Sequence, residues 1–122
     1  MHVVLQPLRV DDRETPVDQP IVAAATPIDA AGRFTLVLTD VVLSGAANPL
    51  TSDQIVAPSL VLAGTACPDF LCGDLSGQIT EPAPIPLNAG LSQFAMQRVA
   101  EGAAYPEPPF INCARELADP LE

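Results

Sequence analysis

Proline is the residue that most restricts how this chain can fold. The sequence contains 14 prolines and 7 glycines in 122 residues, and they divide it into short segments. Proline lacks an amide proton and fixes its own φ, so it interrupts helices and is excluded from central strands. Short apolar segments between Pro and Gly turns are typical of an all-β domain. We therefore predict an antiparallel β-sandwich, or a partly open barrel, of about six to eight short strands.

The clearest expected strand is residues 33–43, RFTLVLTDVVL. Phe34, Leu36 and Leu38 fall on one face of this strand, and Thr and Val alternate on the other face. The alternation breaks at Asp40, because three apolar residues follow it. This break predicts a bulge or a passage into burial on both faces.

The other segments follow from the same pattern. Residues 55–67 are expected as two strands, because Pro58 cannot donate to a central ladder. Residues 91–102 suit a strand or a helix, and we favour a strand because the segments before them are expected to be β. Residues 112–119 allow one short helix near the C-terminus with Asn112 as its N-cap. Further strands are expected at residues 2–10, where Pro7 demands an edge position or a bulge, at 21–26 and at 74–80.

Length and composition set the domain and its class. Residues 1–120 are expected to form a single β domain, and Leu121–Glu122 resembles a cloning-site scar. Hydrophobic residues make up 48% of the chain, which is too many for a disordered acidic segment. No run of eighteen apolar residues occurs, so no membrane span is expected.

The charge balance excludes one class of partner. The formal net charge is -10, all five basic residues are arginines, and no basic cluster offsets the acidic residues. Such a chain repels phosphate backbones, so no nucleic-acid binding is expected. The absence of lysine also suggests a high-GC bacterial genome.

Two of the three cysteines lie close together in CPDFLCGDLSG, residues 67–77. Four residues led by a proline separate Cys67 from Cys72, and we expect these two cysteines to form a local disulfide. On the chain-entropy model so small a loop stabilises the fold by about 2 kcal/mol. A bond from Cys113 to either one is the alternative, and it would anchor the C-terminal tail more strongly. Reduced thiols and a metal site are further alternatives.

No catalytic nucleophile is expected. The GDLSG stretch places Ser76 outward on a strand, and it matches neither the Gly-Asp-Ser-Gly-Gly motif of trypsin-like proteases nor the Gly-x-Ser-x-Gly elbow of α/β-hydrolases. An activated serine needs a positioned base. The chain has one histidine, His2, and no lysine.

Carboxylates are the remaining candidates for chemistry. Six aspartates could serve glycoside hydrolysis, but such sites normally use aromatic platforms, and the chain has no Trp and one Tyr. Calcium binds six to eight oxygen ligands. Asp11, Asp12 and Asp53 are the calcium candidates, although none lies in an Asp-x-Asp-x-Asp-Gly loop. We expect no cofactor.

These observations favour a non-enzymatic module with a binding or structural role. We expect a secreted, periplasmic or cell-surface location after removal of an export signal, because the chain is acidic and a disulfide is expected. Its partner would be a protein, a glycan or another copy of itself. The alternatives are a small carboxylate-based enzyme or ligand carrier, with calcium as an option, and a subunit of a surface assembly that pairs through an edge strand such as residues 2–10.

Overall fold

The computed structural model describes residues 1–23, 25–48 and 51–121 of the chain. Ala24, within the expected strand of residues 21–26, and Glu122, within the expected scar, lie outside the described residues. The fold is antiparallel and nearly all β, as predicted. The described residues form seven strands: β1 (Val4–Leu5), β2 (Ile21–Val22), β3 (Arg33–Leu43), β4 (Ile55–Cys67), β5 (Phe70–Ile79), β6 (Ile85–Leu87) and β7 (Gln93–Gln97). One 3-10 turn, η1 (Gly45–Ala47), follows β3.

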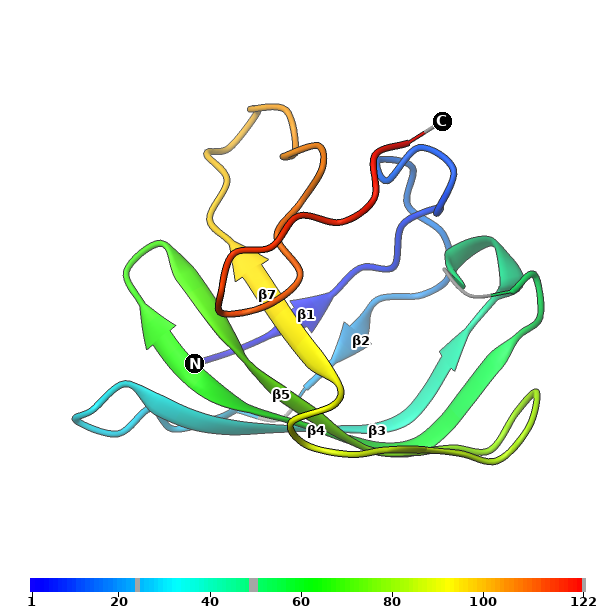
Figure 1. Cartoon of the computed structure of the whole chain (residues 1–122), viewed down its shortest axis with the longest axis horizontal. Helices are drawn as coiled ribbons and strands as arrows, with labels where there is room; N and C mark the ends of the chain where they lie inside the picture. The colour runs from blue at the N-terminus through cyan, green and yellow to red at the C-terminus, as the bar shows by residue number, and fades with distance from the viewer. Residues whose placement is uncertain (24, 49–50, 122) are drawn as a thin grey trace.

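Five of these strands make one curved, open sheet (Figure 1). Its order is β3-β4-β5-β6, and β7 pairs with the same edge of β5 as β6 does. β6 pairs with the Gly77–Ile79 end of β5, and β7 pairs with the Phe70–Asp74 end. The two-stranded β1–β2 sheet lies inside the curve of the larger sheet (Figure 1). β3 is therefore an edge strand, and the larger sheet does not close into a barrel over the described residues.

The core lies between the two sheets. Phe34, Leu36 and Leu38 are buried on the concave face, as their alternation predicts. Leu36 is 1% exposed. Side chains of β1 and β2 and of the segments beside them, including Val3, Leu5, Ile21 and Ala23, belong to the same hydrophobic cluster. The small sheet thus covers part of the apolar concave face, which is the arrangement of a sandwich.

The expected break in alternation occurs at Asp40. Thr39 pairs with Ser59 and Val41 pairs with Ala57, while Asp40 and Pro58 between them form no pair. Asp40 has φ +51, a left-handed conformation that aspartate tolerates better than most residues. On both β3 and β4 the alternation of core-facing side chains shifts by one residue at this place. The two strands therefore stay paired, and β4 continues as one strand. The prediction that Pro58 divides residues 55–67 in two is wrong, because this proline sits at the unpaired position.

The first two strands are much shorter than predicted. Of residues 2–10 only Val4–Leu5 form a strand, and of residues 21–26 only Ile21–Val22 do. After Leu5 the chain enters a loop in which the Gln6 side chain donates hydrogen bonds to the Pro7 and Val17 carbonyls, each at 3.0 Å. Prolines close to both short strands limit the ladder, because each removes a backbone donor.

Two glycines face each other at the centre of the larger sheet. Gly64 of β4 pairs with Gly73 of β5, and this pair lies in a cross-strand row between Phe34 of β3 and Phe94 of β7. With no side chain between them, the two rings meet edge to face over the glycines, with centroids 6.2 Å apart. A Cβ at Gly64 would overlap the Cys72 carbonyl oxygen, and one at Gly73 would overlap the Ala63 carbonyl oxygen. The backbone approach therefore requires glycine at both positions.

Substituting Gly64 tests this close approach. We expect Gly64→Ala to lower the free energy of unfolding by about 2 to 3 kcal/mol, because the added methyl group forces β4 and β5 apart. Gly90→Ala is the control, since Gly90 has φ +87 but nothing within 4 Å of its added Cβ. The control should cost only the backbone strain of about 1 kcal/mol. Equal losses for the two variants, measured by urea unfolding, would contradict the close approach.

Candidate functional site

The candidate site is the free edge of β3, and its geometry follows from the backbone hydrogen bonds at the start of the strand. The Gly32 carbonyl accepts a hydrogen bond from the Ala66 amide of β4 at 2.7 Å. The Arg33 amide donates to Asp29 Oδ1 at 2.9 Å, and the Arg33 carbonyl accepts from the Asp29 amide at 3.0 Å, on the side away from β4. Successive strand residues direct their backbone groups to opposite sides. The N–H and C=O groups of Thr35, Val37 and Thr39 therefore face the free edge.

This edge is open over the described residues. β3 lies at the end of the strand order, and no described segment forms a ladder along Thr35–Thr39 on the side away from β4. The Val37 side chain is 45% exposed on the convex face, and Thr35 and Thr39 beside it are also exposed. An unpaired edge is a template for another strand, and proteins usually protect it with lysine, proline or a bulge. Between Phe34 and Thr39 the sequence has none of these devices.

A surface hollow lies at each end of this free edge. One, of about 630 Å³, is lined by Ile28, Asp29, Arg33 and Thr35 together with residues of β4. The other, of about 490 Å³, is lined by residues 18–22 together with Thr39, Asp40 and Val42. The second hollow is acidic, because Asp18 and Asp40 both line it. A strand that pairs along Thr35–Thr39 would thus meet a hollow beside each of these threonines, and the hollow beside Thr39 is acidic.

The sequence named residues 2–10 as one example of an edge strand for pairing, and of these residues only Val4–Leu5 form a strand, β1. β3 was correctly predicted as a strand, although alternation alone does not distinguish an edge strand from a central one. The available signal was the absence of Pro and Gly throughout residues 33–43.

The predicted Cys67–Cys72 disulfide is wrong. Cys72 is bonded to Cys113, with the two Cα atoms 5.2 Å apart, and Cys67 is an exposed free thiol. Cys67 pairs with Phe70 across the two-residue Pro68–Asp69 turn, so Cys72 lies on the diagonal from Cys67. Diagonal cross-strand neighbours are about 7 to 8 Å apart, which exceeds the reach of a disulfide. A tight hairpin, not a cystine, makes this turn.

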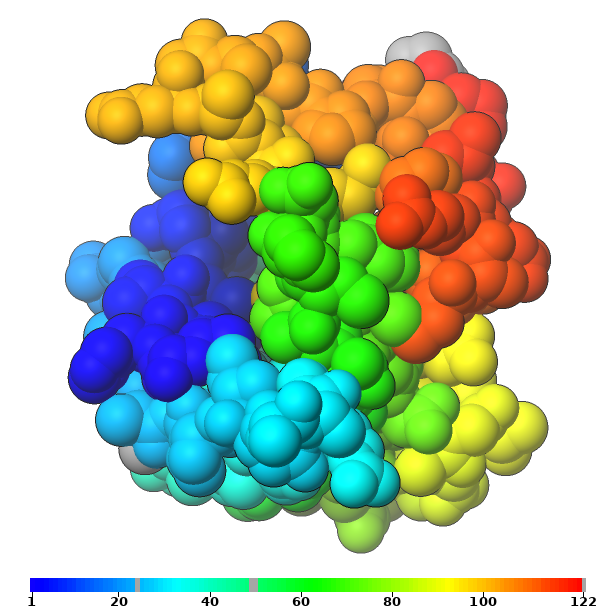
Figure 2. Space-filling model, turned by 90° about the vertical axis from the view of Figure 1, so that its left-hand side faces the viewer, coloured from blue at the N-terminus to red at the C-terminus, as the bar shows by residue number. Residues whose placement is uncertain are grey.

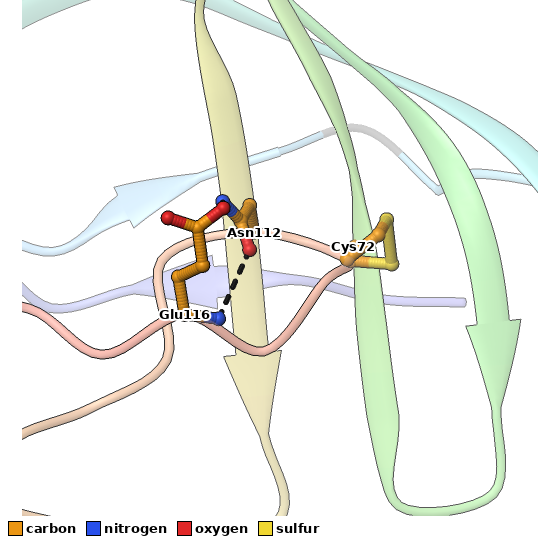
Figure 3. The surroundings of a disulfide bond; sticks show 4 residues. Cys72, Asn112 and Glu116 are labelled. Carbon is orange, nitrogen blue, oxygen red and sulfur yellow. Dashed lines mark hydrogen bonds between the residues drawn. A yellow bond between two sulfur atoms is a disulfide. The ribbon is translucent and has the colours of Figure 1, made fainter.

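The bond to Cys113 fastens the C-terminal tail to the outer face of the sheet (Figure 3). The Phe110 and Phe70 rings meet edge to face at 5.9 Å, and the Phe110 amide donates to Gln97 Oε1 at 2.9 Å. The Arg115 guanidinium lies 4.6 Å from the centroid of the Phe70 ring. In Figure 2 the red C-terminal segment lies against the green β4–β5 hairpin. The tail therefore covers one end of the outer face.

The helix predicted within residues 112–119 does not form. The Arg115 amide donates to the Asn112 carbonyl at 3.1 Å. The Glu116 amide donates to Asn112 Oδ1, also at 3.1 Å (Figure 3). Asn112 thus bonds to the backbone as a cap would, but it closes a single tight turn. An isolated bridge between Phe110 and Leu117 then brings the chain back beside itself, and the disulfide holds this turn against the sheet. The favoured strand assignment for residues 91–102 is confirmed for Gln93–Gln97, which form β7.

The three calcium candidates lie in two different loops. The Asp12 carboxylate accepts hydrogen bonds from the hydroxyl and amide of Thr15 and from the Glu14 amide, and these lower the pKa of Asp12 to about 2. The hydrogen bond from Arg9 lowers the pKa of Asp11. Asp53 lies in the loop before β4, where its amide bonds to Thr51. Among the described residues no three His, Cys, Asp or Glu side chains converge as metal ligands.

The remaining candidate groups are also spread over the fold. Ser76 lies in the middle of β5 opposite Val61, on the outward face that its alternation predicts. Asp74 is on the same face, and Asp69 is in the hairpin turn, 3.7 Å from Arg98. Asp18 and Asp40 share the acidic hollow, but no aromatic side chain is among the described residues that line it. Carboxylate-based sugar chemistry therefore has no platform at this place.

An apolar hollow lies between the two sheets. It measures about 290 Å³ and opens to the surface beside β1. Nine of its lining residues are Leu, Ile or Val: Leu5, Leu8, Ile21, Leu38, Val41, Leu43, Leu60, Leu62 and Leu75. The β1–β2 sheet is too small to cover the whole concave face, so part of that face remains accessible.

The disulfide connectivity can be tested by cleavage before aspartate. Such cleavage separates Cys67 (residues 53–68), Cys72 (69–73) and Cys113 (74–118). We expect non-reducing mass mapping to find 69–73 joined to 74–118. Cys72→Ser should lower the free energy of unfolding by about 4 kcal/mol for a sequence separation of 41, while Cys67→Ser should leave it unchanged. A fragment that joins 53–68 to 69–73 would overturn this connectivity.

Comparison with known proteins adds no assignment. No protein-family model matches this chain, and neither a curated protein nor a solved structure matches it.

Proposed function

We propose that this chain is a non-enzymatic binding module that joins a protein partner by adding the partner's strand to the free edge of β3. The observation that carries the proposal is the row of backbone groups at Thr35, Val37 and Thr39, along which no described segment forms a ladder on the side away from β4. In strand addition these groups supply the affinity, and the alternating side chains supply the specificity. The exposed convex face, with two threonines flanking one valine, provides such side chains.

A protein partner fits this edge better than a glycan does. An extended peptide satisfies backbone donors and acceptors together along the strand, since it alternates the same groups. A glycan is usually bound against aromatic rings, and the described residues that line the two hollows beside the edge include one aromatic residue, Phe34, which is 5% exposed. The polar side chains of the convex face would then form the rim of a peptide site.

We also propose that the module acts outside the cytoplasm, as a secreted, periplasmic or cell-surface protein of bacterial origin. The Cys72–Cys113 disulfide supports this location, because such bonds persist in oxidising compartments and are rare in the cytosol. In the described part of the chain, no helix has the length and apolar character that a membrane crossing needs.

Hydrogen exchange at single residues tests the open edge directly. In a dilute, monomeric sample the amides of Leu36 and Leu38 should exchange slowly, because they bond to β4. The amides of Thr35, Val37 and Thr39 should exchange as fast as loop amides. Slow exchange at these three amides in a monomer would show that the chain covers its own edge, and it would overturn the proposal.

The apolar hollow between the sheets favours a second candidate function, the carriage of a small apolar ligand. Its volume is at the lower limit of ligand pockets, and its lining is mostly aliphatic. Decanoate should then raise the melting temperature of the protein, because a ligand that binds only the folded state stabilises it. Leu60→Phe, which fills the hollow, should abolish the shift, and Val4→Thr on the exposed side of β1 should preserve it. An unchanged melting temperature at saturating decanoate would remove this candidate.

A further inference from the structure

We propose that the partner at the edge of β3 is a second copy of this chain. Two β3 strands would pair antiparallel around a two-fold axis through Val37 and join two five-stranded sheets into one continuous sheet. This inference rests on the proposed function, because it names the partner for the same edge.

The sequence of β3 fits itself in this register. Residues 35–39 read Thr-Leu-Val-Leu-Thr, which is the same in both directions. In an antiparallel pair centred on Val37, Thr35 faces Thr39 of the second copy and Val37 faces its own counterpart. Thr–Thr pairs and pairs of β-branched residues are favourable cross-strand neighbours. A two-fold contact places the same patch on both subunits, so a strand that reads identically both ways is complementary to itself.

The directions of the backbone N–H and C=O groups of β3 fit the same two-fold axis. A two-fold axis through a residue requires its N–H and C=O groups to face the partner if the central pair is to be hydrogen-bonded. Val37 meets this requirement, because the odd-numbered residues from Arg33 to Thr39 direct these groups away from β4. The Val37 pair and the two Thr35–Thr39 pairs would each exchange two hydrogen bonds. The side chains of all these residues lie on the exposed convex face, so the contact needs no rearrangement of the core.

The charges at the ends of the strand also match. Arg33 of one copy falls opposite Val41 of the other, next to Asp40. The hollow at that end is lined by Asp18 and Asp40, so an arginine from the second copy enters an acidic region. The two-fold axis repeats this contact at the other end. Arg33 is 73% exposed in its own pair with Asp29, so it can reorient toward the partner.

A charge exchange at the two-fold axis tests the inference. In Val37→Lys two lysines face each other across the axis, and in Val37→Glu two glutamates do. Each variant alone should weaken self-association roughly tenfold or more, because like charges directly opposite destabilise a strand pair. An equimolar mixture at low salt should form a one-to-one heterodimer. Sedimentation velocity over a range of concentrations measures all three samples, with the unmodified chain as the dimeric reference.

Val4→Lys is the matched control, because Val4 is a valine on β1 that is 60% exposed. This variant should dimerise like the unmodified chain. The inference would be overturned by an unmodified chain that stays monomeric at every concentration, by a Val37→Lys variant that still dimerises, or by a mixture without heterodimer. Heterodimer formation also shows that both variants are folded. Loss of the dimer on Val4→Lys alone would place the interface at β1 and overturn the inference as well.

These results distinguish the proposal that the partner is a second copy from the proposal that a partner strand pairs with the β3 edge. Fast exchange of the Thr35 and Thr39 amides in a chain that remains monomeric would remove the second copy as the partner and leave strand addition intact. Slow exchange of these amides in a monomer would remove both proposals.

Discussion

The close approach of Gly64 and Gly73 is the contact on which the rest of the sheet depends. β4 and β5 are the central pair of strands, and every other strand of the larger sheet pairs with one of them. At their midpoint two glycines bring the backbones together, and Phe34 and Phe94 from the flanking strands meet over them. A side chain at either glycine would collide with a backbone oxygen of the facing strand. The aromatic pair supplies the apolar contact that the glycines lack, which is a known way to stabilise glycine in a sheet.

The segments outside this centre cover different parts of the sheet. The β1–β2 sheet covers part of the concave face, and the C-terminal tail is fastened to the outer face at Cys72. The ion pair of Arg13 with Glu107 and the hydrogen bond from Arg13 to the Asp119 carbonyl join the tail to the N-terminal loop. The far edge of β5 is shared by β6 and β7. No described segment forms a ladder along the edge of β3 between Thr35 and Thr39, and the functional proposal rests on that edge.

Local patterns predicted the fold class well and the long-range contacts poorly. The alternation of residues 33–43, the break at Asp40 and the outward position of Ser76 are set by neighbours two residues apart, so the sequence shows them directly. The Cys72–Cys113 bond depends on where a tail folds back, and no local pattern encodes that position. Pro58 does not divide β4, because the cost of its missing amide proton disappears when the residue opposite, Asp40, also leaves the ladder. The free edge escaped prediction because strand order is a property of the whole sheet.

An isotope-filtered NOE experiment on a mixture of labelled and unlabelled chains tests the central claim most directly. In the proposed pairing Leu36 of one copy and Leu38 of the other form a non-hydrogen-bonded pair, whose α protons lie closest in an antiparallel ladder. The proposal predicts a strong intermolecular NOE between these two α protons in a concentrated sample. The absence of any intermolecular NOE from residues 35–39, or contacts that arise only from other strands, would contradict the claim that a second copy docks on the edge of β3.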